Sequence, residues 1–127
     1  MNKTTYINMI VAIAMFGLVS GCASKPQPFY TYGTYGDSYY AYKKNMTPES
    51  ELALQKAMED AISNSDQSSS GRVPPGMYAN LGYMYLKSGS NAKAIANFTK
   101  EKEVYPEAAH FMDRMIKKVE IAENGAK

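Results

Sequence analysis

The residues that most constrain the fold lie between positions 78 and 106, where their spacing fits two helices packed against each other. Tyr78, Leu81 and Tyr85 share one helical face, because side chains three or four residues apart stack along a helix. Gly82 allows a second helix to approach closely, and Gly89 can adopt the left-handed conformation that ends a helix. This segment therefore predicts a helical hairpin.

The second helix of the hairpin is predicted from the residues that follow Gly89. Asn91 can cap its first turn, Ala94 and Phe98 face back into the pair, and Pro106 stops it. The whole pattern resembles the tetratricopeptide repeat (TPR), with tyrosine at the first position where that family most often has tryptophan. The matching residues are Tyr78, Leu81, Gly82, Tyr85, Gly89, Ala94, Phe98 and Pro106.

One residue departs from the TPR pattern. Glu101 stands where the family usually has a small side chain. Either the packing after Phe98 is looser than in a standard repeat, or that face of the helix is exposed.

Further helices are expected on both sides of the hairpin, since one repeat cannot bury its own core. Thr47 and Pro48 are suited to start a helix over 48–63, and the segment 36–45 can pair with it as a degenerate first repeat. An apolar stripe after Pro106 predicts a C-terminal capping helix. The predicted fold is all-α, a TPR-like array of about five helices without a sheet.

The linking segments are predicted from their composition. Residues 63–75 are rich in serine and end in two prolines, which favours a flexible surface loop. Residues 22–38 are expected to form a tether, 39–122 the helical domain and 123–127 a disordered tail.

The first residues have the layout of a signal peptide, predicted over 1–21. Lys3 supplies a positive start, and an apolar run over 7–19 follows. This run is shorter than the roughly 20 residues that span a hydrocarbon core, so cleavage is favoured over a permanent transmembrane helix.

Cys22, the only cysteine of the chain, follows this apolar run. Val19, Ser20 and Gly21 before it resemble the lipobox of bacterial lipoproteins, which implies that Cys22 carries acyl chains such as palmitate. The alternative is an ordinary secretory signal followed by a chance cysteine. Ala23 implies, by the same resemblance, an anchor in the outer membrane with the domain on its periplasmic face.

The residues offer little for catalysis. His110 is the only histidine, no phosphate-binding loop or metal-ligand cluster appears, and Glu101, Glu103 and Glu107 alternate with lysines as on a solvated helix face. Four methionines are expected to fill the core rather than bind a soft metal: Met77, Met84, Met112 and Met115. With a net charge of +2 and scattered lysines, a nucleic acid is not expected as partner. We therefore expect no enzyme, no metal and no cofactor.

The aromatic residues between positions 29 and 42 are unusually dense, and two interpretations stay open. They can fill a small helical core, or they can present a binding surface. The candidates for partner contact are Tyr35, Tyr39, Tyr40 and Tyr42. A groove lined by Tyr78 and Tyr85 is a further expectation.

A more specific resemblance covers most of the chain from about Tyr32 to Ile116. The residues that carry it are Arg72-Val73-Pro74-Pro75-Gly76-Met77-Tyr78-Ala79, Leu81-Gly82-Tyr83, Glu101-Lys102-Glu103, Tyr105-Pro106-Glu107 and Phe111-Met112-Asp113-Arg114. They are similar to an uncharacterised family of small Gram-negative lipoproteins, often encoded beside a curli-pore-like lipoprotein. TPR lipoproteins that activate peptidoglycan synthases are also similar.

Three functions follow as hypotheses. The first is a non-catalytic scaffold that binds other envelope proteins, as an assembly subunit of an outer-membrane lipoprotein complex. The second is an activator of a class A penicillin-binding protein, and the third is a module that binds peptidoglycan or a small ligand. The partners would be neighbouring lipoproteins or a peptidoglycan synthase.

Overall fold

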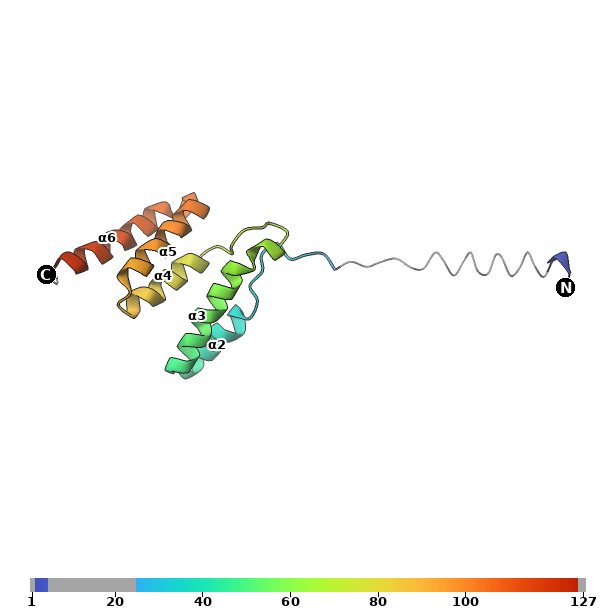
Figure 1. The fold of residues 1–127 in the computed structure, drawn as a ribbon, viewed down its shortest axis with the longest axis horizontal. Coiled ribbons are helices and arrows are strands. Elements are labelled where there is room, and N and C mark those ends of the chain that lie inside the picture. Colours follow the sequence, from blue (N-terminus) through green and yellow to red (C-terminus); the bar gives the residue numbers. More distant parts are fainter. Residues whose placement is uncertain (1, 5–24, 126–127) are drawn as a thin grey trace.

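The computed structural model describes residues 2–4 and 25–125, and within this part the chain forms five packed α-helices and no strand. Consecutive helices run side by side as hairpins (Figure 1). The predicted all-α, TPR-like array is thereby confirmed. In chain order the elements are α2 (Tyr35–Asn45), α3 (Pro48–Ser63), the 3-10 turn η2 (Ser65–Gln67), α4 (Met77–Lys87), α5 (Asn91–Val104), the 3-10 turn η3 (Pro106–Ala108) and α6 (Ala109–Gly125).

The first hairpin, α2 with α3, is the predicted degenerate pair. α2 ends where Met46 adopts a left-handed conformation and its N–H donates to the Tyr42 carbonyl. α3 begins at a capping box, in which Thr47 and Ser50 each accept a hydrogen bond from the other's backbone N–H. No residue of α2 is buried, so half-buried tyrosines such as Tyr35 and Tyr42 attach this helix to the core.

The second hairpin, α4 with α5, is formed by the segment that carries the TPR-like pattern. A Cβ added at Gly82 would lie 2.8 Å from Cε1 of Phe98, so only glycine lets the two helices come this close. Gly89 has a φ of 75° just beyond the end of α4. Ser90, not Asn91, occupies the N-cap of α5, and its side chain makes no capping hydrogen bond.

Two apolar clusters hold the helices together. The first joins α3, the following loop and α4 through Leu54, Met58, Ala61, Val73, Met77, Leu81 and Met84. The second joins α5 and α6 through Ala94, Phe98, Met112 and Val119, with Met115 packed against it. The methionines expected in the core therefore belong to it, three of them buried and Met115 partly so.

The loop after α3 differs from its prediction as a flexible surface segment. Val73 is 8% exposed and Pro74 is fully buried, and the Tyr105 hydroxyl donates a hydrogen bond to the Val73 carbonyl. The Arg72 guanidinium lies 4.7 Å from the centre of the Tyr105 ring. Serine-rich composition misled the prediction, because Val73 and Pro74 are buried, although Arg72 and Pro75 beside them are exposed.

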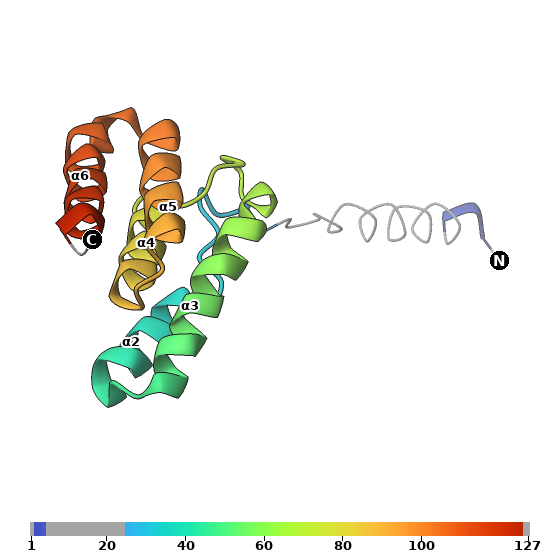
Figure 2. The same ribbon diagram turned by 60° about the vertical axis from the view of Figure 1, so that its left-hand side comes forward.

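The start of the chain's ordered packing also differs from its prediction. The Ser69 and Ser70 N–H groups donate to the carbonyls of Pro28 and Phe29, so residues 28 and 29 run beside the loop (Figure 2). The tether expected over 22–38 therefore includes packed residues, and α2 begins at Tyr35 within it. At the other end, α6 continues to Gly125, into the segment expected to be disordered. Cys22 and most of the predicted signal peptide lie outside the described residues.

Candidate functional site

The first, third and fifth helices, α2, α4 and α6, line a groove along one side of the array. One cavity of about 370 Å³ lies between α2 and α4, and another of about 300 Å³ lies between α4 and α6. Asn80 and Tyr83 of α4 line both cavities, so the two adjoin along α4. We call them together the α4 groove.

The cavity between α2 and α4 is rich in hydrogen-bond donors, and we call it the donor cavity. Met58 and Met84 form its apolar floor. The residues with polar groups around it are Tyr35, Tyr39, Tyr42, Lys43, Asn80, Tyr83 and Lys87. None of the described residues that line it carries a carboxylate.

Hydrogen bonds fix the side chains of the donor cavity in place. The Lys87 ammonium donates to the Tyr42 hydroxyl at 2.9 Å and to Glu51 Oε1 at 3.4 Å, which ties α4 to α2 and α3. These bonds, that to Tyr42 first, raise the pKa of Lys87. Asn80 Nδ2 donates to the Tyr35 hydroxyl at 3.2 Å. Burial, followed by the nearby Tyr39, raises the pKa of Tyr35, so its phenol is neutral at physiological pH.

The cavity between α4 and α6 is mostly apolar, and we call it the apolar cavity. Phe98 and Met112 form its floor, and Ala79 and Met115 flank it. Phe111 and Tyr83 are 55% and 54% exposed, although both are large aromatic residues. Exposed aromatic rings beside an apolar hollow are typical of surfaces that bind partners.

Aromatic rings also connect the N-terminal segment to the donor cavity. Successive ring centres are 4.8 to 6.4 Å apart in the order Phe29, Tyr30, Tyr32, Tyr35 and Tyr39. Tyr35 and Tyr39 thus belong both to this packed row and to the cavity wall. The two interpretations of the tyrosines, packing and partner contact, are compatible in this geometry.

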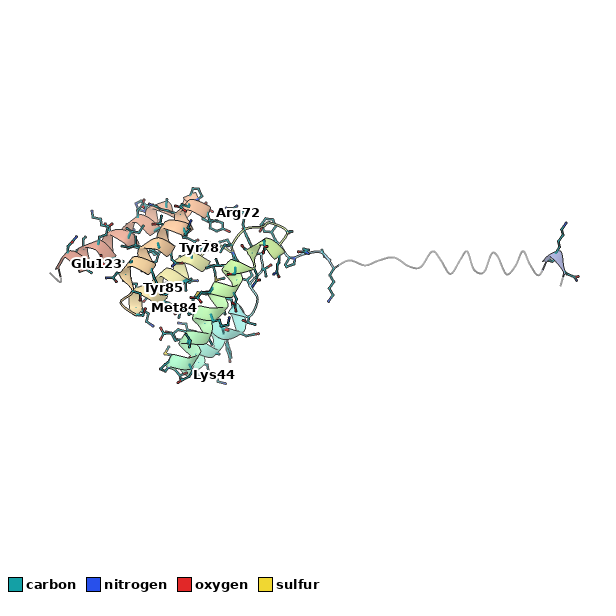
Figure 3. The ribbon with its side chains drawn as sticks, in the orientation of Figure 1. Lys44, Arg72, Tyr78, Met84, Tyr85 and Glu123 are labelled. Atoms are coloured by element: carbon teal, nitrogen blue, oxygen red, sulfur yellow. The ribbon has the colours of Figure 1, made fainter. Side chains whose placement is uncertain are left out.

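The candidate partner residues occupy different places. Tyr35, Tyr39 and Tyr42 line the donor cavity, whereas Tyr40 is 70% exposed and does not line it. Tyr78 and Tyr85 do not line the groove either, contrary to expectation. Both are half-buried against the core cluster of α3 and α4 (Figure 3).

Tyr85 instead links three helices. Its hydroxyl donates to Glu59 Oε1 of α3 at 2.9 Å, and the Lys93 ammonium of α5 lies 5.1 Å from its ring centre. Burial and the hydrogen bond with Glu59 raise the pKa of Tyr85. Its role in the structure is to join α3, α4 and α5.

The other signature residues serve packing. Leu81, Gly82, Ala94 and Phe98 are buried. Gly89 and Pro106 lie at the two turns that bound α5. None of these six residues has a chemically reactive side chain.

Glu101 is buried, which excludes the exposed-face interpretation. It is only 3% exposed and accepts hydrogen bonds from the N–H groups of Gly76 at 2.7 Å and Ala79 at 3.2 Å. Gly76 is the N-cap of α4 and has no side chain to cap the helix, and Ala79 lies in the first turn of α4. The carboxylate of α5 therefore caps α4, which is a structural role.

Neither His110 nor Glu103 lines the α4 groove. His110 is exposed, and Glu103 pairs with Lys100 at 3.3 Å on the surface of α5. The described residues contain no group of three or more histidine, cysteine, aspartate or glutamate side chains placed to hold a metal ion. Among the helices of the described part, none is long and apolar enough to span a membrane.

Three of the groove residues that were not predicted from the sequence share one face of α4. Asn80, Tyr83 and Lys87 are three and four residues apart, so they form a stripe beside the buried face of Met77, Leu81 and Met84. A polar and aromatic stripe at helical spacing was the available signal. Lys43 and Phe111 carried no comparable signal, because their place in the groove depends on how the helices stack.

The fold and the groove together define a TPR-like helical array in which the α4 groove is open and partly aromatic. The chain belongs to the family described as "Domain of unknown function (DUF4810)", whose model matches residues 29–115. The match begins at Phe29, within the segment that packs against the loop, and ends in α6. No curated protein and no solved structure matches the chain.

Proposed function

We propose that this protein is a non-catalytic, lipid-anchored TPR-like scaffold that binds other envelope proteins, as an assembly subunit of an outer-membrane lipoprotein complex. The observation that carries the proposal is the α4 groove, in which exposed Tyr83 and Phe111 lie beside cavities of about 370 and 300 Å³. Monomeric proteins seldom leave such aromatic hollows open unless a partner covers them.

The lipid anchor on Cys22 gives the proposal its geometry. Pro28 is already hydrogen-bonded to Ser69, so the six residues 23–28 are the whole connection between the lipid and the packed domain. Fully extended, they reach about 21 Å at ~3.5 Å per residue. The domain would therefore stay beside its own membrane, where neighbouring lipoproteins are within reach.

The short reach of this connection disfavours the second hypothesis, in which the protein activates a class A penicillin-binding protein. Such an activator must reach a synthase anchored in the other membrane, and a connection of about 21 Å gives little reach. We retain it as the second candidate because the synthase could extend toward the domain. Identification of the partner by photocrosslinking separates the scaffold from the synthase activator.

The third candidate, a module for peptidoglycan or a small ligand, is favoured by one observation. The donor cavity has the size of a small-molecule site and is ringed by tyrosine hydroxyl groups. Co-sedimentation of the purified protein with isolated sacculi tests it. Binding that Tyr39→Ala abolishes would support this candidate, whereas a protein that stays in the supernatant would exclude peptidoglycan.

Site-specific photocrosslinking in living cells tests the leading proposal. A photoreactive phenylalanine analogue replaces Tyr83 in the groove, and the matched control places it at Leu52, which is 67% exposed on α3 and does not line the groove. We expect lipoproteins of the same membrane to be captured at position 83 only, and to be lost with Cys22→Ser. Capture of a penicillin-binding protein would establish the activator instead, and equal capture at both positions would refute the groove as the binding site.

A further inference from the structure

The two cavities of the α4 groove differ in chemistry. The donor cavity holds two lysines, an asparagine and several tyrosine hydroxyls, and no carboxylate among the described residues that line it. The apolar cavity is lined by Phe98, Phe111, Met112 and Met115. A segment lying along α4 would therefore meet positive charge and donors at one end, and apolar side chains at the other.

The charge at the donor end is available to a ligand. The Lys43 ammonium lies 5.9 Å from the centre of the Tyr39 ring, and no carboxylate of the described residues forms an ion pair with it. Lys87 has one carboxylate neighbour, Glu51, at 3.4 Å, with side chains 43% and 39% exposed. One carboxylate beside two ammonium groups leaves the donor cavity with a net positive charge.

The hydroxyl and amide groups favour the same kind of ligand. Tyr35 and Tyr42 already accept hydrogen bonds from Asn80 and Lys87, so their own O–H groups remain to donate. Phenol, amide and ammonium donors that converge on one hollow can hold the two oxygens of a carboxylate. A cationic ligand would find hydroxyl and amide acceptors there but no carboxylate to neutralise its charge, since no anionic side chain of the described residues lines the hollow.

We propose that the α4 groove binds an acidic peptide segment of its partner, with Asp or Glu carboxylates in the donor cavity and a large apolar side chain in the apolar cavity. This inference rests on the proposed scaffold function and names the chemistry of the partner. Electrostatic complementarity sets the specificity of such contacts, whereas burial of the apolar side chain supplies affinity.

An anionic membrane surface is the other source of negative charge, and the position of the lysines argues against it. Lys43 lies in the last turn of α2, beside Lys44. Figure 3 shows Lys44 at the end of the molecule far from Arg72, and in both ribbon views α2 ends away from the described N-terminal segment (Figures 1 and 2). The lysine side of the donor cavity is thus away from the proposed anchor, whereas Tyr35 on its other side packs against Tyr32 of the N-terminal segment.

Selection from a library of short random peptides tests the inference. The full chain, held in detergent micelles and immobilised through a C-terminal tag, selects displayed peptides, and the enriched sequences are compared with the unselected library. We expect enrichment of Asp and Glu together with a large apolar residue. A chosen peptide is then titrated by fluorescence polarisation, and a copy with its acidic residues changed to lysine should not bind.

Charge variants locate the contact. Lys43→Glu and Lys87→Glu should each weaken binding of the selected peptide by about tenfold, because each replaces an attraction with a repulsion. Lys44→Glu is the matched control, since it makes the same change on the same helix turn outside the cavity, and it should leave binding unchanged. Raising salt from about 0.1 M to about 1 M shortens the Debye length from about 10 Å to about 3 Å and should also weaken binding. Circular dichroism checks that each variant is folded.

Three results would overturn the inference in different ways. Neutral or basic peptides that bind, and that Tyr83→Ala or Phe111→Ser releases, would refute the acidic partner but leave the scaffold groove standing. A selection that enriches nothing over the tag alone would count against both. Unchanged affinity in Lys43→Glu and Lys87→Glu would also refute the assignment of the carboxylate to the donor cavity.

Discussion

At the scale of single residues, Glu101 has the most specific structural role. Glu101→Ala would leave the Gly76 and Ala79 N–H groups without their acceptor inside a buried site. We expect a loss of about 1–3 kcal/mol in the free energy of unfolding. Urea denaturation followed by circular dichroism measures it. Glu103→Ala is the control, since its surface ion pair with Lys100 should contribute less than about 1 kcal/mol, and an equal loss in both variants would contradict the capping role.

Gly82 and Gly36 provide a matched pair for the close approach of α4 and α5. A methyl group at position 82 would meet the Phe98 ring at 2.8 Å, whereas nothing lies within 4 Å of one at position 36. Gly82→Ala should lower the free energy of unfolding by about 1–3 kcal/mol through overpacking. Gly36→Ala should raise it by up to about 1 kcal/mol, since alanine favours the helix. Thermal melting separates the two, and equal melting temperatures would refute the tight contact.

The residues whose packing roles were predicted correctly from the sequence are those whose roles depend only on their position along one helix. Leu81, Gly82 and Phe98 pack as the repeat pattern predicts, because spacing alone determines which face they occupy. The groove is different, since Lys43, Tyr83 and Phe111 come together from three helices. Their proximity depends on how the hairpins stack, which the local pattern does not contain.

At the scale of elements, the loop after α3 is the segment that composition described worst. Counting serines and prolines over 63–75 predicted flexibility, but Val73 and Pro74 fill the space between α3, α4 and the Tyr105 ring. Residues 28 and 29 pair with the same loop. The loop and the N-terminal segment, neither of which has a helical pattern, thus stabilise each other through long-range contacts. Local sequence patterns do not predict such contacts.

The titration of Tyr105 should lower the stability of this region at alkaline pH. Burial first, and the neighbouring Tyr30 second, raise the pKa of Tyr105 well above its ordinary value of 10.0. Because the folded state holds this proton more tightly than the unfolded chain does, the stabilisation is complete below pH 10.0 and is lost as the pH rises above it. Denaturation midpoints across alkaline pH should therefore fall for the wild type.

Tyr105→Phe isolates that contribution. The variant loses the hydrogen bond to the Val73 carbonyl, so it should be less stable by about 0.5–1.5 kcal/mol at neutral pH. Its stability should then fall less steeply above pH 10.0 than that of the wild type. Tyr40→Phe, at a residue that is 70% exposed, should reproduce the wild-type slope. Identical slopes for all three proteins would show that Tyr105 does not titrate differently on folding.

At the scale of the whole molecule, the ends of the array have separate roles. The N-terminal segment, the loop after α3 and Tyr105 form one packed region, and the Lys43 and Lys87 side of the donor cavity lies toward the opposite end of α2. If Cys22 carries the lipid, the first region lies nearest the anchor and these two lysines lie on the far side of the groove from it. The short connection of residues 23–28 then limits how far from the membrane the groove can lie.

Lengthening this connection discriminates between a partner in the same membrane and one across the periplasm. A flexible Gly/Ser insert of about 40 residues after Lys25 would add a mean reach of about 35 Å. For a neighbouring lipoprotein, crosslinking from position 83 should fall several-fold, because effective concentration drops as a linker outgrows its span. For a synthase in the opposite membrane, the same insert should raise crosslinking, since it brings the groove within reach. An insert of equal length after Lys127, which leaves the connection unchanged, should alter neither.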